Sequence, residues 1–254
     1  MSEDKSFHKE CKNEIELMGQ DLVLKDKAMD FMATLSKLKY SYHFEWLGRP
    51  IIQFPQDIVA LQEIIWETKP DLIIETGIAH GGSLVLSASI LALLDLMDSE
   101  DGSKVGPQRK VIGIDIEIRE HNRLAINSHP LRSRIEMIEG SSTDSEIFSK
   151  VKNIAKHFRK VMICLDSNHS HDHVLKELDL YSELVTSGQY LVVFDTMIEK
   201  FPAGYYFDRN WDRGNSPMTA VNEFLLTNQE FTNQIGIENK LLITSAPGGY
   251  LLRK

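Results

Sequence analysis

Five short runs of mostly apolar residues recur along the chain, and the first four are each followed by a stretch with helical spacing. The runs cover residues 72–75, 111–116, 134–139, 161–166 and 190–195. Continuous apolar runs of this length are typical of strands buried on both faces of a parallel sheet. The intervening helices are expected at residues 84–97, 119–127, 147–157 and from 173 to about 184. This alternation predicts an α/β fold.

The end of the chain breaks the alternation. A helix is expected around residues 219–227, and two closing strands at residues 240–244 and 250–253, separated by Ala-Pro-Gly-Gly. The elements together predict a mainly parallel seven-stranded sheet with an antiparallel C-terminal strand and helices on both faces.

The beginning of the chain has a different pattern. Residues 1–40 are charged and mostly helical in pattern, with a ragged apolar stripe, and a further helix is expected at residues 55–68 between two prolines. We therefore expect an N-terminal helical extension, residues 1–45, docked on the core or on a second subunit. Residues 46–254 would form the α/β catalytic domain.

Two aromatic-rich segments lie outside the regular pattern. Residues 196–218 have little periodicity and contain five of the aromatic residues, which is typical of a functional lid or a disordered loop. In residues 40–48, the side chains of Tyr42, Phe44 and Trp46 either cover a cofactor or anchor the extension.

Composition excludes several classes of protein. A chain of 254 residues with 42% hydrophobic and 26% charged residues can form one sizeable domain with an extension. The net charge of −9, without a basic cluster, makes nucleic acid an unexpected partner. The apolar stretch at residues 84–97 is too short to span a bilayer, so no transmembrane segment is expected. No secretory signal is visible, and two distant cysteines suggest no disulfide, so a cytoplasmic location is expected.

The candidate chemistry begins where the first strand meets its helix. Glycines at positions 77, 81 and 82 let a ligand approach the backbone, and the helix N-terminus would face its negative groups. An acid precedes the first glycine in the spacing E-x-G-x-x-x-G, which is associated with enzymes that use S-adenosylmethionine (SAM), a ligand with both positive and negative groups. The alternative is a tight turn in another kind of α/β protein. The predicted cofactor contacts here are Glu75, Thr76, Gly77, His80, Gly81, Gly82 and Ser83.

Acids also end later strands. Asp115, beside Ile116, could accept both ribose hydroxyls of the cofactor, because the carboxyl ends of parallel strands face the ligand crevice. The polar turn with Ser141 and Ser142 is either an adenine-side contact or the cap of the next helix. Asp166 and Asp195 end the fourth and fifth strands, which would bring them close together. The order of elements is that of the Rossmann-like class I SAM methyltransferases.

Three stretches carry a resemblance to a known family: Glu75-Thr-Gly-Ile-Ala-His-Gly-Gly-Ser83, Leu165-Asp-Ser-Asn-His169 and Val192-Val-Phe-Asp-Thr196. With them, the chain from about Trp46 to Tyr250 resembles the cephalosporin hydroxylase / rhamnosyl O-methyltransferase family. The resemblance implies SAM-dependent O-methylation, in many members of sugar hydroxyls. Related macrolide-sugar methyltransferases use Mg²⁺ and a histidine base.

The resemblance also implies roles for individual residues. Asp166 would contact the cofactor, bind the metal and take part in catalysis, His169 would be the base, and Asp195 would be a second metal ligand. The chain departs from those relatives at Phe194, where they carry a glutamate. Mg²⁺ commonly needs only one or two carboxylates, so the site can survive this loss.

Each assignment has an alternative. The aspartates could cap helices, and His169, His171 and His173 could form a zinc site. Lid residues could contact the acceptor, with Tyr205, Tyr206 and Trp211 stacking on a sugar and with Arg209 and Arg213 binding an anion, or could pack only within the lid.

The leading hypothesis is a SAM-dependent, Mg²⁺-assisted O-methyltransferase, expected to form a homo-oligomer. Its acceptor would be a hydroxyl of a sugar or of a glycosylated small molecule, lipid or polysaccharide. One alternative is a non-catalytic SAM-binding or oligomeric scaffold protein. Another is a metal-dependent oxygenase, which would need two histidines and one carboxylate.

Overall fold

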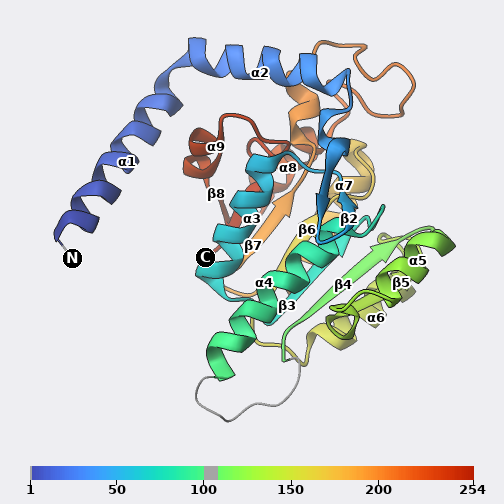
Figure 1. The fold of residues 1–254 in the computed structure, drawn as a ribbon. Coiled ribbons are helices and arrows are strands. Elements are labelled where there is room, and N and C mark those ends of the chain that lie inside the picture. Colours follow the sequence, from blue (N-terminus) through green and yellow to red (C-terminus); the bar gives the residue numbers. More distant parts are fainter. Residues whose placement is uncertain (1, 100–107) are drawn as a thin grey trace.

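A seven-stranded sheet forms the centre of the computed structural model, which describes residues 2–99 and 108–254 (Figure 1). The strands are β3 (Leu72–Thr76), β4 (Lys110–Asp115), β5 (Ile135–Glu139), β6 (Val161–Leu165), β7 (Tyr190–Val193), β8 (Phe231–Asn233) and β9 (Tyr250–Arg253). Their order across the sheet is β5-β4-β3-β6-β7-β9-β8. Strand β9 pairs antiparallel with β7 and β8, and the other neighbours pair parallel. The predicted fold class is confirmed.

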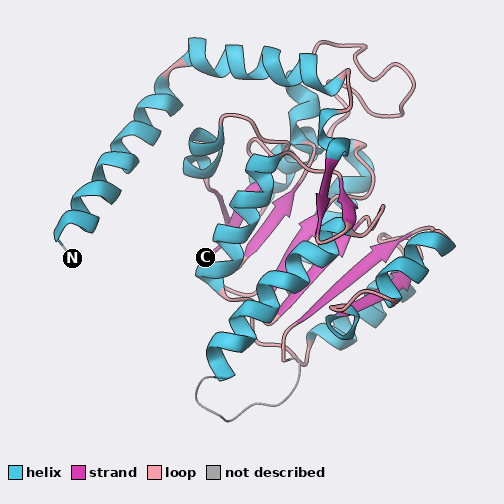
Figure 2. Ribbon diagram, viewed as in Figure 1, coloured by secondary structure: helices cyan, strands magenta, loops and turns pink. Residues whose placement is uncertain are grey.

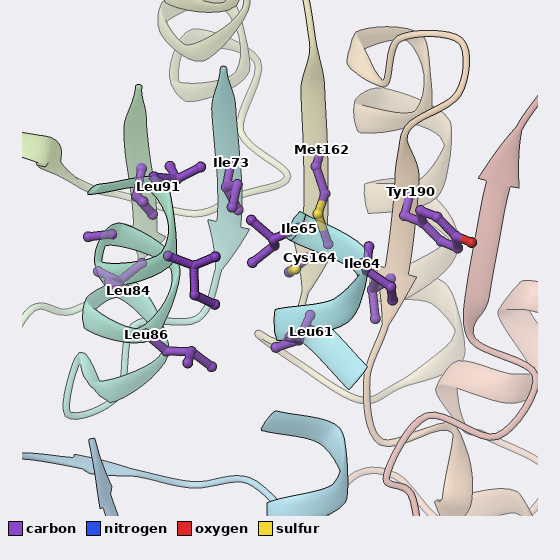
Figure 3. Packing of buried hydrophobic residues seen from close by; sticks show 14 of the residues in the cluster. Leu61, Ile64, Ile65, Ile73, Leu84, Leu86, Leu91, Met162, Cys164 and Tyr190 are labelled. Carbon is purple, nitrogen blue, oxygen red and sulfur yellow. The ribbon is translucent and has the colours of Figure 1, made fainter. Parts of the chain in front are cut away.

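Helices cover both faces of this sheet (Figure 2). One layer contains α3 (Pro55–Thr68), α4 (Gly82–Ser99) and α5 (Glu120–Asn127), and the other contains α6 (Ser145–Ala155), α7 (His171–Tyr181) and α8 (Pro217–Thr227). Figure 3 shows the first layer, where Ile65 of α3 and Leu84 of α4 lie against Ile73 of β3. These side chains are fully buried, so the strands are apolar on both faces as the continuous runs predicted.

Helix α4 is the one helix of the described residues that is long and apolar enough to cross a membrane. Half of that stretch is buried inside the structure. Its side chains Leu84, Leu91 and Leu94 belong to the core between the helices and the sheet. The arrangement is that of a core helix.

The prediction of a strand at residues 240–244 is wrong. Helix α9 (Ile235–Leu241) occupies the start of that range, and β8 is the strand that pairs with β9. Ile237 and Leu241, four residues apart, share one helical face and pack against the first core. Phe231 of β8 is instead buried against Phe224 of α8, with ring centroids 5.6 Å apart. Leu241 therefore belongs to a helix face, whereas Ile243 follows the helix and packs with the cluster of Met32 and Phe54.

The N-terminal arm, residues 2–43, contains α1 (Ser2–Gln20), α2 (Leu22–Ser36) and the 3₁₀ helix η1 (Tyr40–His43). Helix α1 leads away from the sheet to the left in Figure 1, and its C-terminal end contacts α9. At that contact, a Cβ on Gly19 would lie 2.2 Å from the side chain of Asn239. Helix α2 instead docks through Met32, which packs with Phe54 and Phe201.

A small hairpin that the sequence pattern did not predict follows the arm. It consists of β1 (Phe44–Trp46) and β2 (Arg49–Ile51). Phe44 and Trp46 pack against the core, and Trp46 Nε1 donates a hydrogen bond to Ser89 Oγ at 3.1 Å. Phe44 and Trp46 therefore anchor the extension to the core, which is one of the two alternatives predicted for the aromatic segment. Tyr42 lies at the cavity described below.

A buried carboxylate joins α3 to the chain ahead of β9. Asp57 is fully buried and accepts hydrogen bonds from Ser245 N (2.8 Å), Ser245 Oγ (2.9 Å), Tyr250 Oη (2.9 Å) and Thr244 Oγ1. Burial raises the pKa of Asp57, although these hydrogen bonds oppose the shift. The contact fixes one wall of the cavity, since Ser245 lines it.

Candidate active site

A cavity of about 790 Å³ opens where β3, β6 and β7 end. Its walls come from four parts of the chain: the glycine turn at residues 77–83, the ends of β6 and β7, the arm with residues 50–54, and the lid, residues 196–216. The lid begins with the 3₁₀ helix η4 (Thr196–Lys200). In parallel sheets this edge is the usual place for a ligand.

The turn at residues 77–83 packs closely against backbone from other segments, which explains why it contains three glycines. Gly77 and Gly81 have φ values of 89° and 82°, in the region that favours glycine. A Cβ on Gly77 would lie 2.0 Å from the carbonyl oxygen of Asp166, and one on Gly82 would lie 2.3 Å from that of Pro50. Helix α4 begins at Gly82, so its first backbone N–H groups face the cavity wall.

Side chains from other elements hold the turn in place. Arg49 donates to the carbonyl oxygen of His80 and to Asn122 Oδ1, and Asn122 Nδ2 donates to the carbonyl oxygen of Ala79 at 2.8 Å. Asp115 Oδ2 accepts from the backbone N–H groups of Ile78 (2.8 Å) and Ala79 (3.3 Å). Asp115 therefore stabilises the turn and does not line the cavity.

Glu75 lies behind the turn. It is 4% exposed, and its carboxylate accepts a hydrogen bond from Ser83 Oγ. Burial raises the pKa of Glu75 to about 7, and the Ser83 bond opposes that shift. Ser83 lines the cavity and Glu75 does not. Glu75 can therefore influence a bound ligand through the Ser83 hydroxyl or through the charge of its carboxylate behind the cavity wall.

The structure brings Asp166, His169 and Asp195 together. Their potential ligand atoms all lie within 4.8 Å of one another, and His169 Nε2 lies 3.1 Å from Asp195 Oδ2. Asp166 directly follows β6 and Asp195 lies two residues after the end of β7, and these strands are parallel neighbours. Burial raises the pKa of Asp166 well above its ordinary value, and the charge of Asp195 adds to the shift. Two acids this close favour a bound cation, which would relieve their repulsion.

Gln53 is a residue of this cluster that sequence reasoning missed. It is 4% exposed, lines the cavity, and donates a hydrogen bond from Nε2 to Asp166 Oδ2 at 3.3 Å. Its Oε1 is buried and has no hydrogen-bond partner within the described structure. It lies in the link between β2 and α3, and the only signal nearby was the helix start at Pro55.

The lid reaches the cluster through Trp211. This indole and the His169 ring form a T-shaped contact, with centroids 4.8 Å apart and planes at 84°. The lid is fastened to its own base, since Glu199 Oε2 accepts from Gly214 N (2.9 Å) and Ser216 Oγ (2.7 Å). It is also fastened to the arm, because Tyr205 Oη donates to the carbonyl oxygen of Ala33 at 2.7 Å.

Several predicted cofactor contacts lie away from the cavity. Thr76 is fully buried beneath the turn, and Ile116 is 75% exposed on its own loop. Ser141 bonds Thr143, and Ser142 Oγ lies 3.3 Å from His173 Nε2. The last residue of this polar turn, Asp144, caps the next helix, since it accepts hydrogen bonds from two N–H groups at the start of α6. This agrees with the alternative that the turn caps a helix.

The three histidines after β6 do not converge. His171 Nδ1 bonds Thr219 Oγ1 at 2.8 Å and its Nε2 lies 3.3 Å from Glu223. His173 Nε2 instead lies 3.1 Å from Ser167 Oγ. Among the described residues, the cluster of Asp166, His169 and Asp195 is the one group of three or more potential ligands close enough to share a metal, so nothing supports the histidine zinc site.

Comparisons with known proteins identify relatives of this chain. Residues 38–254 match the family described as rhamnosyl O-methyltransferase/CmcI. The rhamnosyl O-methyltransferase of Mycobacterium tuberculosis is 33% identical over 209 residues, covering 78% of this chain and 73% of that protein. The enzyme of the same name from Mycobacterium leprae is 28% identical over 214 residues, covering 82% of each.

Solved structures share the fold. A CmcI structure with Mg and SAM superposes with a TM-score of 0.53 at 19% identity, covering 84% of this chain and 77% of that one. CalS11, a TDP-rhamnose 3′-O-methyltransferase, superposes with a TM-score of 0.52 at 12% identity, covering 96% and 93%. At these identities the likeness concerns the architecture alone.

Proposed function

Because the chain belongs to the rhamnosyl O-methyltransferase/CmcI family and is a SAM-dependent O-methyltransferase, we propose that it methylates a sugar hydroxyl. The sugar would be free or part of a glycosylated small molecule, lipid or polysaccharide. The observation that carries the proposal is the meeting of His169 with two carboxylates in the same cavity as the glycine turn. The names of the curated relatives support a sugar as the acceptor.

The cofactor would bind along the glycine turn. When bound, SAM supplies an electrophilic methyl group on its sulfonium. The N–H groups from His80 to Ser83 suit its carboxylate, and the acid of Glu75 suits its positive groups. The ribose and adenine would extend toward Asp115, Ile116, Ser141 and Ser142, which is still a prediction. For Asp115 it requires the carboxylate to exchange the bonds that it makes to Ile78 and Ala79.

The chemistry of the donor set fits a magnesium ion. Asp166 and Asp195 supply carboxylate oxygens, which Mg²⁺ prefers, and rotation of the Gln53 amide, whose Nε2 now faces Asp166, would turn its unpartnered Oε1 toward them. When bound there, the ion would lower the pKa of an acceptor hydroxyl. Phe194, where relatives carry a glutamate, is 3% exposed and packs in the core, so it contributes no ligand.

His169 would serve as the general base. The ring nitrogen that does not face Asp195 would take the hydroxyl proton, and Asp195, whose Oδ2 lies 3.1 Å from Nε2, would stabilise the imidazolium that forms. Trp211 restricts the rotation of the imidazole by its edge contact. The cluster has one histidine and two carboxylates, the reverse of the set that an iron oxygenase needs.

The test combines binding and turnover. SAM is titrated by calorimetry with and without Mg²⁺, and S-adenosylhomocysteine release is measured over a panel of sugars. His169→Ala should keep SAM affinity and lose about 10²–10⁴-fold in turnover, the usual contribution of a positioned base. Removal of Mg²⁺ should lower turnover more than SAM binding.

The matched control is His171→Ala, which changes a histidine two residues away that faces Thr219 and Glu223. It should turn over at the wild-type rate. Equal turnover of wild type and His169→Ala would exclude His169 as the base, and SAM binding without turnover on any sugar would favour the scaffold reading.

We further propose that residues 1–45 are an extension to the catalytic domain, residues 46–254, and that the arm joins copies of the chain into a homo-oligomer. Exposed apolar side chains support this role: Phe7, Leu17, Leu22, Val23 and Phe31 are 53–72% exposed. Both cysteines are free, which suits the proposed cytoplasmic location.

A further inference from the structure

The part of the cavity built by the arm and the lid carries positive charge. Lys37, Lys39 and Arg209 all line it, and within the described structure none of the three is in an ion pair. The chain as a whole has a net charge of −9. With three cations outside ion pairs, this opening is therefore locally positive on a chain that is negative overall. One lid acid, Asp208, lines the same region.

The deep part of the cavity has the opposite sign. Asp166 and Asp195 lie there at the strand ends. An acceptor with one anionic end would be attracted to the cations at the opening, so its neutral hydroxyl end would enter first. The charge distribution therefore orients such an acceptor as well as attracting it.

Arg209 is connected to the proposed base by a single side chain. Its guanidinium carbon lies 5.4 Å from the centroid of the Trp211 ring, and that ring makes a T-shaped contact with His169. The Trp211 ring therefore separates a group bound by Arg209 from the proposed base, His169. Lys39, whose ammonium lies 6.0 Å from the Tyr42 centroid, and Lys37 approach the cavity from the arm.

We propose that the acceptor is a phosphorylated sugar, a phosphate or diphosphate ester, whose phosphate is bound by Arg209, Lys37 and Lys39. This inference rests on the proposed function and specifies its substrate class. The planar guanidinium can bind two phosphate oxygens at once, and the ammonium groups act as mobile point charges. The lid arginine at position 213, which composition alone could not distinguish from Arg209, does not line the cavity.

The experiment titrates the protein, saturated with S-adenosylhomocysteine, with inorganic pyrophosphate, glucose 1-phosphate, glucuronate and glucose, using calorimetry. Pyrophosphate and glucose 1-phosphate should bind, more weakly as salt rises, and glucose should not. Arg209→Gln, and separately the pair Lys37→Gln with Lys39→Gln, should weaken pyrophosphate binding about tenfold or more, as expected for loss of charge-assisted contacts.

Arg213→Gln is the matched control and should bind pyrophosphate like the wild type, while Arg209→Lys should restore part of the affinity. Equal pyrophosphate binding by Arg209→Gln and wild type, or none by the wild type at millimolar concentration, would overturn the inference. Tighter binding of glucuronate than of glucose 1-phosphate would overturn the assignment to phosphate.

A separate SAM titration distinguishes this failure from failure of the proposed function. SAM binding and turnover on neutral sugars with no pyrophosphate binding would remove the phosphate site alone. Pyrophosphate binding through Arg209 without SAM binding would remove the proposed function and leave the phosphate site standing.

Discussion

Asp166 is surrounded by other acids, and this environment defines the chemistry of the cavity. Its pKa is raised by burial first, then by the charges of Asp195, Glu75, Glu177 and Asp57. The hydrogen bond from Gln53 is the one side-chain donor to it within the described structure. Burying several acids together costs free energy, which a cation or a cationic ligand can offset. The acids around Asp166 therefore favour the binding of positively charged groups in this cavity, such as a metal ion and the sulfonium of the cofactor.

The shifted pKa of Glu75 predicts a pH-dependent stability. Its pKa is about 7 in the folded protein against 4.5 ordinarily. Between these values the unfolded chain has released the proton that the folded protein retains, so the free energy of unfolding falls as pH rises through this window. The loss is about 3 kcal/mol and is complete above pH 7. Glu75→Gln should reduce this slope by that amount in urea unfolding midpoints measured from pH 4.5 to 8, and the raised pKa values of Asp57 and Asp166 should leave a remaining slope.

Glu120→Gln, a change of an exposed glutamate on α5, serves as the control and should keep the wild-type slope. Parallel profiles for wild type and Glu75→Gln would show that Glu75 titrates normally.

At the residue scale, the sequence predicted the acids and histidine of the cluster, but not their neighbours. Asp166 and Asp195 could be found because each ends an apolar run, and strand ends meet at one edge of a sheet. Gln53 follows no such pattern, and its contact with Asp166 depends on how the β2–α3 link crosses the sheet. The bonds of Asp115 to the turn could not be predicted either, since they depend on the positive φ of 45° at Ala79.

At the element scale, α3 is held to the C-terminal segment by one buried carboxylate. Asp57→Ala would leave the donors of Thr244, Ser245 and Tyr250 buried without an acceptor. The expected loss is about 3–5 kcal/mol in the free energy of unfolding, measured with urea. Asp57→Asn should lose less, because its amide oxygen still accepts.

Asp144→Ala is the control for Asp57→Ala. It tests whether removing any aspartate at the start of a helix lowers the free energy of unfolding by the same amount. Asp144 is an exposed N-cap of α6, and its loss should cost about 1 kcal/mol. Equal costs for Asp57→Ala and Asp144→Ala would contradict the role of the buried network.

The elements that could be predicted are those with one dominant pattern. Strands β3, β4, β6 and β7 were visible because both of their faces are mostly buried, whereas β5, at the edge of the sheet, is only partly buried. Strands β1, β2 and β8 have three residues each, too few to establish a period. The apolar residues from Leu241 to Ile243 resembled a strand because Leu241 ends the helical face of α9 and two more apolar residues follow directly after the helix.

At the scale of the whole molecule, the arm extends the α/β domain and presents apolar side chains to the surroundings. A double substitution, Leu17→Glu with Val23→Glu, should prevent association of copies, since charged groups cannot be buried unpaired in an apolar contact. Light scattering should show an oligomer for the wild type and a monomer for the variant.

Leu226→Glu is the control, because Leu226 is 80% exposed on α8, outside the arm. It should keep the wild-type mass. A monomeric wild type, or an arm variant with unchanged mass, would contradict the proposed role of the arm.

The hydrogen bond from Tyr205 of the lid to Ala33 of the arm has an evolutionary consequence. The proposed cofactor side of the cavity belongs to the sheet and its turns, where a methyl group added at Gly77 or Gly82 would collide with backbone. The acceptor side belongs to two surface segments that tolerate change. Descendants of this chain can therefore diversify the molecule that they modify by altering those segments in concert, without disturbing how the methyl donor is held.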